Sequence, residues 1–325
     1  MKNKTFTINQ KKIETVFIPA FKLSEVVSGA PDTLHPAFLS NGKAIDGFYV
    51  SKYQCVLNDG LLSSTAGAIP TTGVTYDEAS QACLNLGKGW GVISALQWGA
   101  IALWCYENGT MPFGNNDFGK DYRENQVVAT PATVENDKTA IVLTGSGPTS
   151  WSHDHTKEGI YDLNGNVWEW NSGLRLHYGE LQVATFPRYE TDFTWLAIDA
   201  DTGELVEGGK QTGNTVMLDF TCGKWTFARS CDKNEQIRSC LFSQLSVASD
   251  VCEKAKSFIT ALGLLPLEDT GDLLFYACNG KPDRVTFRGG KWSLGSNSGL
   301  FKTCVDDPRT LKGAIGIRAV FVEEK

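Results

Sequence analysis

The sequence has no run of 18 apolar residues, which is close to the length that a membrane-spanning helix needs. Residues 1–21 carry positive charge but no apolar core, so we expect neither a signal peptide nor membrane insertion. The nine cysteines are an odd number and cannot all pair within the chain. We therefore expect a protein made in a cytoplasm, with most of its cysteines reduced and buried. A virus particle assembled in that cytoplasm fits equally well.

Several motifs that carry chemistry are also missing. No Cys-x-x-Cys pair is present, so the common zinc spacings are absent. The dinucleotide fingerprint fails after Gly145-Ser146-Gly147, and a nucleophile elbow would need serine where Asn297 stands. His153 and His155 could share a metal, but two solvated loop side chains are the simpler interpretation. The sequence predicts no catalytic residues and no metal site.

Basic residues are fewer than acidic ones, with 30 Lys and Arg against 37 Asp and Glu and a formal net charge of −7. Sequence-independent nucleic-acid binding needs a basic face, so we expect no nucleic-acid partner. Hydrophobic residues make up 42% of the 325 positions, which is typical of a folded chain. The 33 glycines and nine tryptophans suggest many tight turns around an aromatic core.

Local patterns predict three helices among many short strands. Thr75 and Glu78 form a capping box, Ser94 caps a helix over 95–106, and 246–264 resembles a third helix that opens at Ser249 or Asp250. The helix over 95–106 is apolar on most sides, which predicts burial. The expected class is α+β, with few helices and much irregular structure. We expect one domain over 1–325, with N-terminal strands in 1–41 and a large insertion at about 171–283.

Two segments are more specific than the rest. The first, 159–170, reads GIYDLNGNVWEW; the second, 287–292, reads FRGGKW and is followed by IGIR at 315–318. Trp168 and Trp170 alternate with Glu169, so both indoles should face one side of a strand and be more than half buried, while Glu169 faces the other side.

These segments resemble the formylglycine-generating enzyme (sulfatase-modifying factor) family, whose fold is a variant of the C-type lectin fold. The resemblance covers about 42–170 and 284–322 and implies a C-type lectin-like fold of that type. Enzymes of this family hold Ca²⁺, so the resemblance leaves a Ca²⁺ site open beside the simpler interpretation of 159–170 as a folding element. The family's copper oxidases use two cysteines five residues apart. Those positions are Gly299 and Cys304 here, so one of the two thiols is missing.

The stretch 288–318 has a narrower resemblance, to the variable region of proteins diversified by retroelements, many of them on phage tails. The resemblance implies a scaffold and a set of diversified positions, with no periodicity typical of a strand or helix. The scaffold residues are Trp168, Trp170, Arg288, Trp292, Phe301 and Arg318. The expected variable, ligand-binding positions are Ser293, Leu294, Lys302, Cys304, Asp306, Asp307, Leu311, Gly313 and Ala314.

The resemblance predicts a receptor-binding protein and not an enzyme. It implies a phage-tail or prophage-encoded protein of the virion tail, which attaches to a host or other surface. Its partners would be a cell-surface or other exposed macromolecule and other tail proteins, and a homotrimer would add avidity. We expect the variable side chains from Ser293 to Leu311 to be largely exposed on one contiguous face. A ligand-binding relative without diversification, an ordinary surface loop and a copper oxidase are the alternatives.

Overall fold

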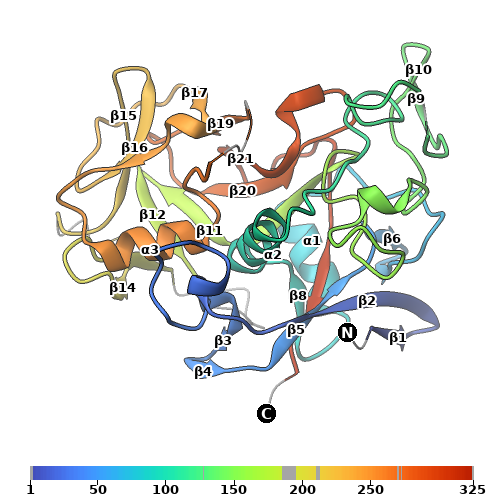
Figure 1. The fold of residues 1–325 in the computed structure, drawn as a ribbon, viewed down its shortest axis with the longest axis horizontal. Helices are drawn as coiled ribbons and strands as arrows, with labels where there is room; N and C mark the ends of the chain where they lie inside the picture. The colour runs from blue at the N-terminus through green and yellow to red at the C-terminus, as the bar shows by residue number, and fades with distance from the viewer. Residues whose placement is uncertain are drawn as a thin grey trace.

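The computed structural model describes residues 3–126, 128–184, 195–209, 213–268, 271 and 273–323 (Figure 1). The regular elements of these residues are mostly β-strands, together with three α-helices. The expected α+β class, with many short strands and few helices, is confirmed at this level. Across the described ranges, no helix is long and apolar enough to cross a membrane.

Two of the helices begin where the sequence predicts. Helix α1 (Tyr76–Leu84) is capped by Thr75, whose hydroxyl accepts from the Glu78 amide while the Glu78 carboxylate accepts from the Thr75 amide. Helix α2 (Ala95–Glu107) is capped by Ser94 in the same way. Ten of the 13 residues of α2 are buried, as expected for a helix that is apolar on most sides.

The third helix is shorter than predicted. Helix α3 (Glu253–Ala261) begins after an N-cap at Cys252, not at Ser249 or Asp250. The start of the predicted range, Ser246–Val247, is strand β18, which pairs with a strand about twenty residues earlier in the chain. Non-local pairing therefore overrides the local helical pattern at this point.

The two ends of the described chain meet in one five-stranded sheet. Its core side carries the side chains of Val16, Ile18, Phe48, Val50 and Val320, all of which are buried. In spatial order the strands are β1 (Lys4–Ile8), β2 (Lys11–Pro19), β5 (Gly47–Ser51), β23 (Ala319–Phe321) and β8 (Trp90–Val92).

The second sheet has 12 strands and is built around three long ones. These are β11 (Trp168–His177), β20 (Arg284–Gly289) and β21 (Gly299–Pro308). The segment predicted as an insertion extends this sheet on both sides of them (Figure 1). Beside β21 lie β19 (Leu274–Ala277) and β17 (Arg238–Leu241); on the β11 side lie β12 (Glu180–Val183), β13 (Leu196–Ile198), β14 (Leu205–Glu207), β15 (Met217–Thr221), β16 (Lys224–Ala228) and β18.

The remaining strands are short. Strand β22 (Ile315–Gly316) runs parallel to the start of β11. The others form three small hairpins: β3 (Leu39–Ser40) with β4 (Lys43–Ala44), β6 (Val56–Asn58) with β7 (Leu61–Ser63), and β9 (Val134–Glu135) with β10 (Lys138–Thr139).

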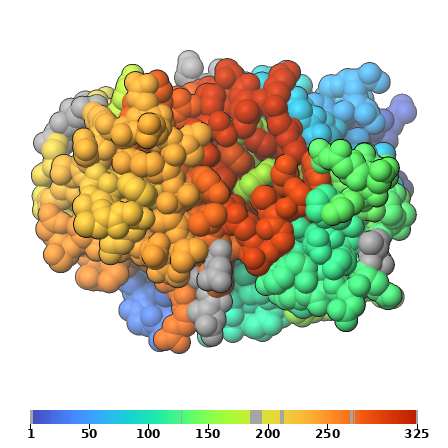
Figure 2. Space-filling model, turned by 90° about the horizontal axis from the view of Figure 1, so that it is seen from above, coloured from blue at the N-terminus to red at the C-terminus, as the bar shows by residue number. Residues whose placement is uncertain are grey.

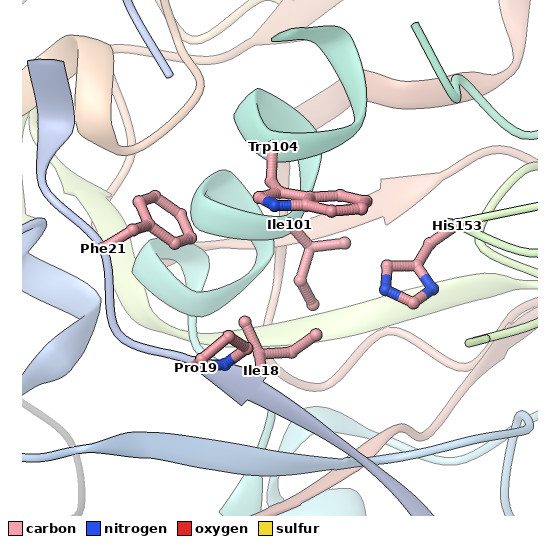
Figure 3. Close-up of a pocket in the computed structure, with 6 residues that line it drawn as sticks. All are labelled: Ile18, Pro19, Phe21, Ile101, Trp104 and His153. Carbon is pink, nitrogen blue, oxygen red and sulfur yellow. The ribbon is translucent and has the colours of Figure 1, made fainter. Parts of the chain in front are cut away.

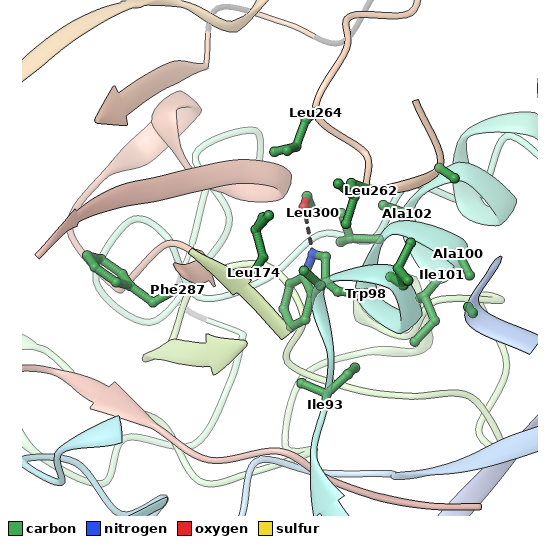
Figure 4. Packing of buried hydrophobic residues seen from close by; sticks show 14 of the residues in the cluster. Ile93, Trp98, Ala100, Ile101, Ala102, Leu174, Leu262, Leu264, Phe287 and Leu300 are labelled. Carbon is green, nitrogen blue, oxygen red and sulfur yellow. Dashed lines mark hydrogen bonds between the residues drawn. The ribbon is translucent and has the colours of Figure 1, made fainter. Parts of the chain in front are cut away.

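One large hydrophobic cluster joins helices and sheets from Ile13 to Val322. Helix α2 packs at its centre, where the Trp98 indole N–H donates to the Leu300 carbonyl of β21 at 2.7 Å (Figure 4). Leu262, just after α3, belongs to the same cluster. The predicted insertion is therefore packed against the elements that carry the sequence motifs.

The segment 159–170 acts as a folding element. Gly165 has a φ of +75°, and a Cβ there would lie 2.1 Å from the Asn115 carbonyl oxygen. Asn166 accepts from Asn115 and donates to Gln54, so this turn ties two distant loops together. A glycine is required at position 165 because both its backbone conformation and its close contact exclude a side chain.

Strand β11 confirms the predicted alternation. Trp168 and Trp170 both pack edge-to-face on Phe287, at ring distances of 5.1 and 5.5 Å. Trp170 is fully buried and Trp168 is half-buried. Glu169 points the other way and pairs with the buried Arg318 through two hydrogen bonds of 2.7 Å.

Candidate functional site

Strand β21 brings three of the predicted variable residues together. Lys302, Cys304 and Asp306 lie along it, and their side chains are close enough to act on one another's charge, although the pairing with β20 shifts register between Cys304 and Asp307. Cys304 lies opposite Phe287 of β20 and Tyr276 of β19, which therefore share this side. We define the β21 face as Lys302, Cys304, Asp306 and the three aromatic residues Trp168, Tyr276 and Phe287.

Lys302 is the buried cation of this face. Its ammonium donates to the Leu274 carbonyl at 2.5 Å and to Asn297 Oδ1 at 2.9 Å. It also lies 4.4 Å from the ring centre of Tyr276 and 5.9 Å from that of Trp168. Burial lowers the pKa of Lys302 to about 8, against the opposing effect of the acidic neighbours. The aromatic rings of this face can thus lie against a cation.

Cys304 and Asp306 are acidic groups whose pKa values are raised, which favours their neutral forms. Burial, followed by the nearby charge of Asp306, raises the pKa of the Cys304 thiol well above its ordinary value. Burial, followed by Asp307, raises the pKa of Asp306 to about 7. Asp306 Oδ1 is buried and has no hydrogen-bond partner among the described residues. Asp306 is therefore a buried polar group whose hydrogen bonding the described residues do not complete.

Figure 2 shows a hollow on this side of the molecule, where red atoms of the C-terminal segment surround a yellow-green floor. Yellow-green marks the stretch around the start of β11. Trp168, at the start of β11, is partly exposed and lies beside Lys302 and Phe287 of the β21 face.

The expectation that the variable side chains are largely exposed is wrong for three of them. The exposed fractions of Lys302, Cys304 and Asp306 are 1%, 5% and 9%. The cause is that β21 is an interior strand, because β19 and β17 from the predicted insertion extend the sheet beyond it. Charged side chains are mostly exposed, and nothing local to residues 299–308 predicts those extra strands.

Of the other predicted variable positions, Asp307 lies near the end of β21 and the rest lie in the two loops that flank this strand. Ser293 is exposed as expected. The rest are half-buried and so depart in part from the expectation, and Leu311 packs against the main core. A Cβ at Gly313 would have Ile315 Cγ1 as its nearest contact, at 3.9 Å, so that position has room for a side chain. The half-buried positions are Leu294, Asp307, Leu311, Gly313 and Ala314.

Five of the six predicted scaffold residues are more deeply buried than these half-buried positions. Trp170, Arg288, Phe301 and Arg318 are fully buried, and the exposed fraction of Trp292 is 9%. Arg318 has a carboxylate partner in Glu169, whereas Arg288 has no carboxylate partner among the described residues. The Arg288 guanidinium donates once, to the Leu262 carbonyl at the C-terminal end of α3, where the helix dipole favours a cation.

Tyr276 and Phe287 also belong to the site, although the sequence did not predict them. Phe287 stands directly before the predicted scaffold residue Arg288, and its alternation with Arg288 along a strand is the signal that could have placed it on the opposite side. Tyr276 lies in the segment 171–283, which resembles nothing that would assign it a role. Its position beside Cys304 follows only from the parallel pairing of β19 with β21.

The position of the missing cysteine is at the beginning of β21. Gly299 has a φ of +146°, and the nearest atom to a Cβ placed there is Leu273 Cδ2 at 4.0 Å. All nine cysteines are described, and none forms a disulfide; six of them are buried. Within the described ranges, no group of three or more His, Cys, Asp or Glu side chains is arranged to hold a metal.

His153 is buried, which corrects the prediction of a solvated loop side chain. Its ring packs 5.4 Å from Trp104, and its Nδ1 accepts from the Ile160 amide at 2.9 Å. Burial lowers its pKa to about 4. With Ile18, Pro19, Phe21 and Ile101, these two rings line an apolar cavity of about 50 Å³ (Figure 3). His155, two residues on, is exposed.

Comparisons with known proteins give structural neighbours but no family. No family model matches the chain, and no curated protein matches it. Among solved structures, the chain is similar to the Major Tropism Determinant U1 variant at 13% identity and a TM-score of 0.36, covering 95% of this chain and 63% of that one. The chain thus spans less than two thirds of that protein.

Two further neighbours match over 99% of both chains. One is PvdO from Pseudomonas aeruginosa, at 14% identity and a TM-score of 0.35. The other is Treponema denticola variable protein 1, at 13% identity and a TM-score of 0.33. Similarity at this level does not establish a shared fold or function.

Proposed function

We propose that the chain is a ligand-binding protein that displays a diversified surface on a C-type lectin-like scaffold of the formylglycine-generating-enzyme type. The observation that carries the proposal is the grouping on β21. Three residues that the sequence resemblance assigns to variable positions share one sheet face with Trp168 and Tyr276. The proposed binding surface is the β21 face together with its flanking loops, 291–298 and 308–314.

The chemistry of this face suits recognition. An aromatic floor offers apolar area to a ligand, and aromatic residues dominate binding energies at protein surfaces. Ser293 is exposed and the half-buried variable positions are partly open, so these side chains can contact a ligand directly.

The alternative, a copper oxidase, needs two thiols to hold the metal, and of the two positions only Cys304 carries one. At the second thiol position stands Gly299, which has no side chain. We therefore propose a binding function without catalysis.

The context of the proposal is attachment to a surface. The proposed location is a phage tail, encoded by a phage or a prophage, and the proposed ligand is an exposed macromolecule of a host or other cell. Other tail proteins would hold the chain in place. A homotrimer would allow several weak sites to act together, which raises overall avidity without new contacts.

Sequencing the DNA that flanks the gene tests this proposal. We expect a near-repeat of codons 288–318 close by, differing from the gene mainly at the nine variable codons, and a reverse transcriptase gene beside it. In sister isolates, substitutions should concentrate at those same codons. If no near-repeat is present and the nine codons vary no more than the scaffold codons, the proposed diversification is wrong.

A further inference from the structure

A second hollow lies on the other side of the loop that precedes β21. It is a cavity of about 410 Å³ between the end of α2, the loop around Arg123 and residues 296–299. A cavity of this size is within the range of small-molecule sites. Its lining includes Tyr106, Tyr122, Arg123 and Ser296, none of which is a predicted variable position. The cavity shares the loop 291–298 with the proposed binding surface but none of the predicted variable positions, so its ligand can be tested separately from the proposed function.

Arg123 is held rigidly at the wall of this cavity. Its Nε and Nη2 donate to the two carboxylate oxygens of the fully buried Asp121, at 2.6 and 2.8 Å. The guanidinium also lies 3.6 Å from the ring centre of Phe113. Asp121 in turn accepts hydrogen bonds from the Gly114 amide and from Asn116 Nδ2. The guanidinium is thus oriented before any ligand arrives, which lowers the entropic cost of binding.

Part of this guanidinium is still able to donate hydrogen bonds. Arginine carries five N–H groups, and Nη1 of Arg123 has no acceptor among the described residues. Asp121 compensates the positive charge at close range. Glu268, whose carbonyl accepts from the Tyr106 hydroxyl, is acidic and exposed. The cavity therefore offers donors without a surplus of positive charge, which favours a neutral oxygen over a carboxylate or a phosphate.

Aromatic rings and a hydroxyl complete the lining. Tyr122 is 46% exposed, so much of its ring is open to solvent. The ring of Tyr106 is fixed by its hydrogen bond and packs edge-to-face with Phe301. Ser296 is exposed and adds a hydroxyl. A pyranose ring presents apolar C–H faces and a rim of hydroxyl groups, and tyrosine likewise joins an apolar body to a polar tip.

From this lining we infer that the cavity binds a neutral saccharide, with sugar hydroxyl oxygens accepting from Arg123 and the ring lying against tyrosine. Saturation-transfer NMR on the full chain tests this, with the methyl glycosides of glucose, galactose and mannose as probes and methyl glucuronide as the charged comparison. We expect saturation transfer to the ring protons of at least one neutral glycoside, and a weaker signal from the glucuronide.

Two variants and a control locate the binding. Arg123→Gln and Ser296→Trp should each weaken glycoside binding by about tenfold or more, the first by removing the donors and the second by filling the cavity. Ser296→Trp leaves the Arg123–Asp121 pair intact, so it remains informative if Arg123→Gln is unstable. Arg229→Gln, which also removes an aspartate-paired arginine but one that does not line the cavity, should change nothing. Absence of transfer to all three neutral glycosides, a stronger glucuronide signal, or unchanged binding in Ser296→Trp would overturn the inference.

Discussion

Trp170→Ala is expected to lower the free energy of unfolding by about 3–5 kcal/mol, and Trp168→Ala by only about 1–2 kcal/mol. Trp170 is fully buried, packs on Tyr76 and Phe287, and donates to the Val74 carbonyl at 3.0 Å. Its removal leaves a large cavity and an unpaired carbonyl. The Trp168→Ala variant should lose less stability because Trp168 is only partly buried.

Urea unfolding of both variants and the parent, at unchanged m-value, measures this difference. The pair is well matched, because both residues are tryptophans of the same strand and both contact Phe287. Equal losses in the two variants would mean that Trp168 is an ordinary core residue. It would then not be available to a ligand on the β21 face.

Arg318→Met is expected to lower the free energy of unfolding by about 3–5 kcal/mol, whereas Arg288→Met should change it by no more than about 1 kcal/mol. Both arginines are fully buried. Arg318 neutralises Glu169 and also donates to the carbonyls of Ser51 and Tyr161, so its loss leaves a buried carboxylate without a cation. Arg288 has no carboxylate partner, and burial lowers its pKa to about 9.

Replacing an unpaired buried charge by an apolar side chain of similar length removes a cost of desolvation together with one hydrogen bond to Leu262. The two effects oppose each other, and this is why Arg288→Met should be nearly neutral. Thermal and denaturant melts of both variants provide the measurement. An Arg288→Met variant that is as unstable as Arg318→Met would show that the dipole of α3 stabilises this cation far more than we expect.

The helices show what local sequence can predict. Thr75 with Glu78, and Ser94 with Gln97, make capping boxes whose two partners are three residues apart, so the start of each helix follows from adjacent residues. Helix α3 was predicted to begin too early because Ser246 pairs with Thr226 of β16, and that pairing depends on how the sheet is assembled.

The candidate site likewise has one part that local sequence predicts and one part that it does not. The alternation of Trp168, Glu169 and Trp170 predicts which side chains share a side of β11, because a strand repeats every two residues. The burial of Lys302, Cys304 and Asp306 could not be predicted in this way. It depends on β19 and β17, which come from the segment that resembles no known motif.

A display library of the full chain, randomised at the nine predicted variable positions, tests the central claim most directly. A matched library randomises the six predicted scaffold positions, and both are treated with protease and panned against lysozyme as a defined probe. We expect most members of the first library to resist protease and to yield lysozyme binders, because six of the nine positions are exposed or half-buried. The second library should lose protease resistance. If both libraries are equally protease-sensitive, or if the first yields no binder, the β21 face and its loops are not a tolerant binding surface.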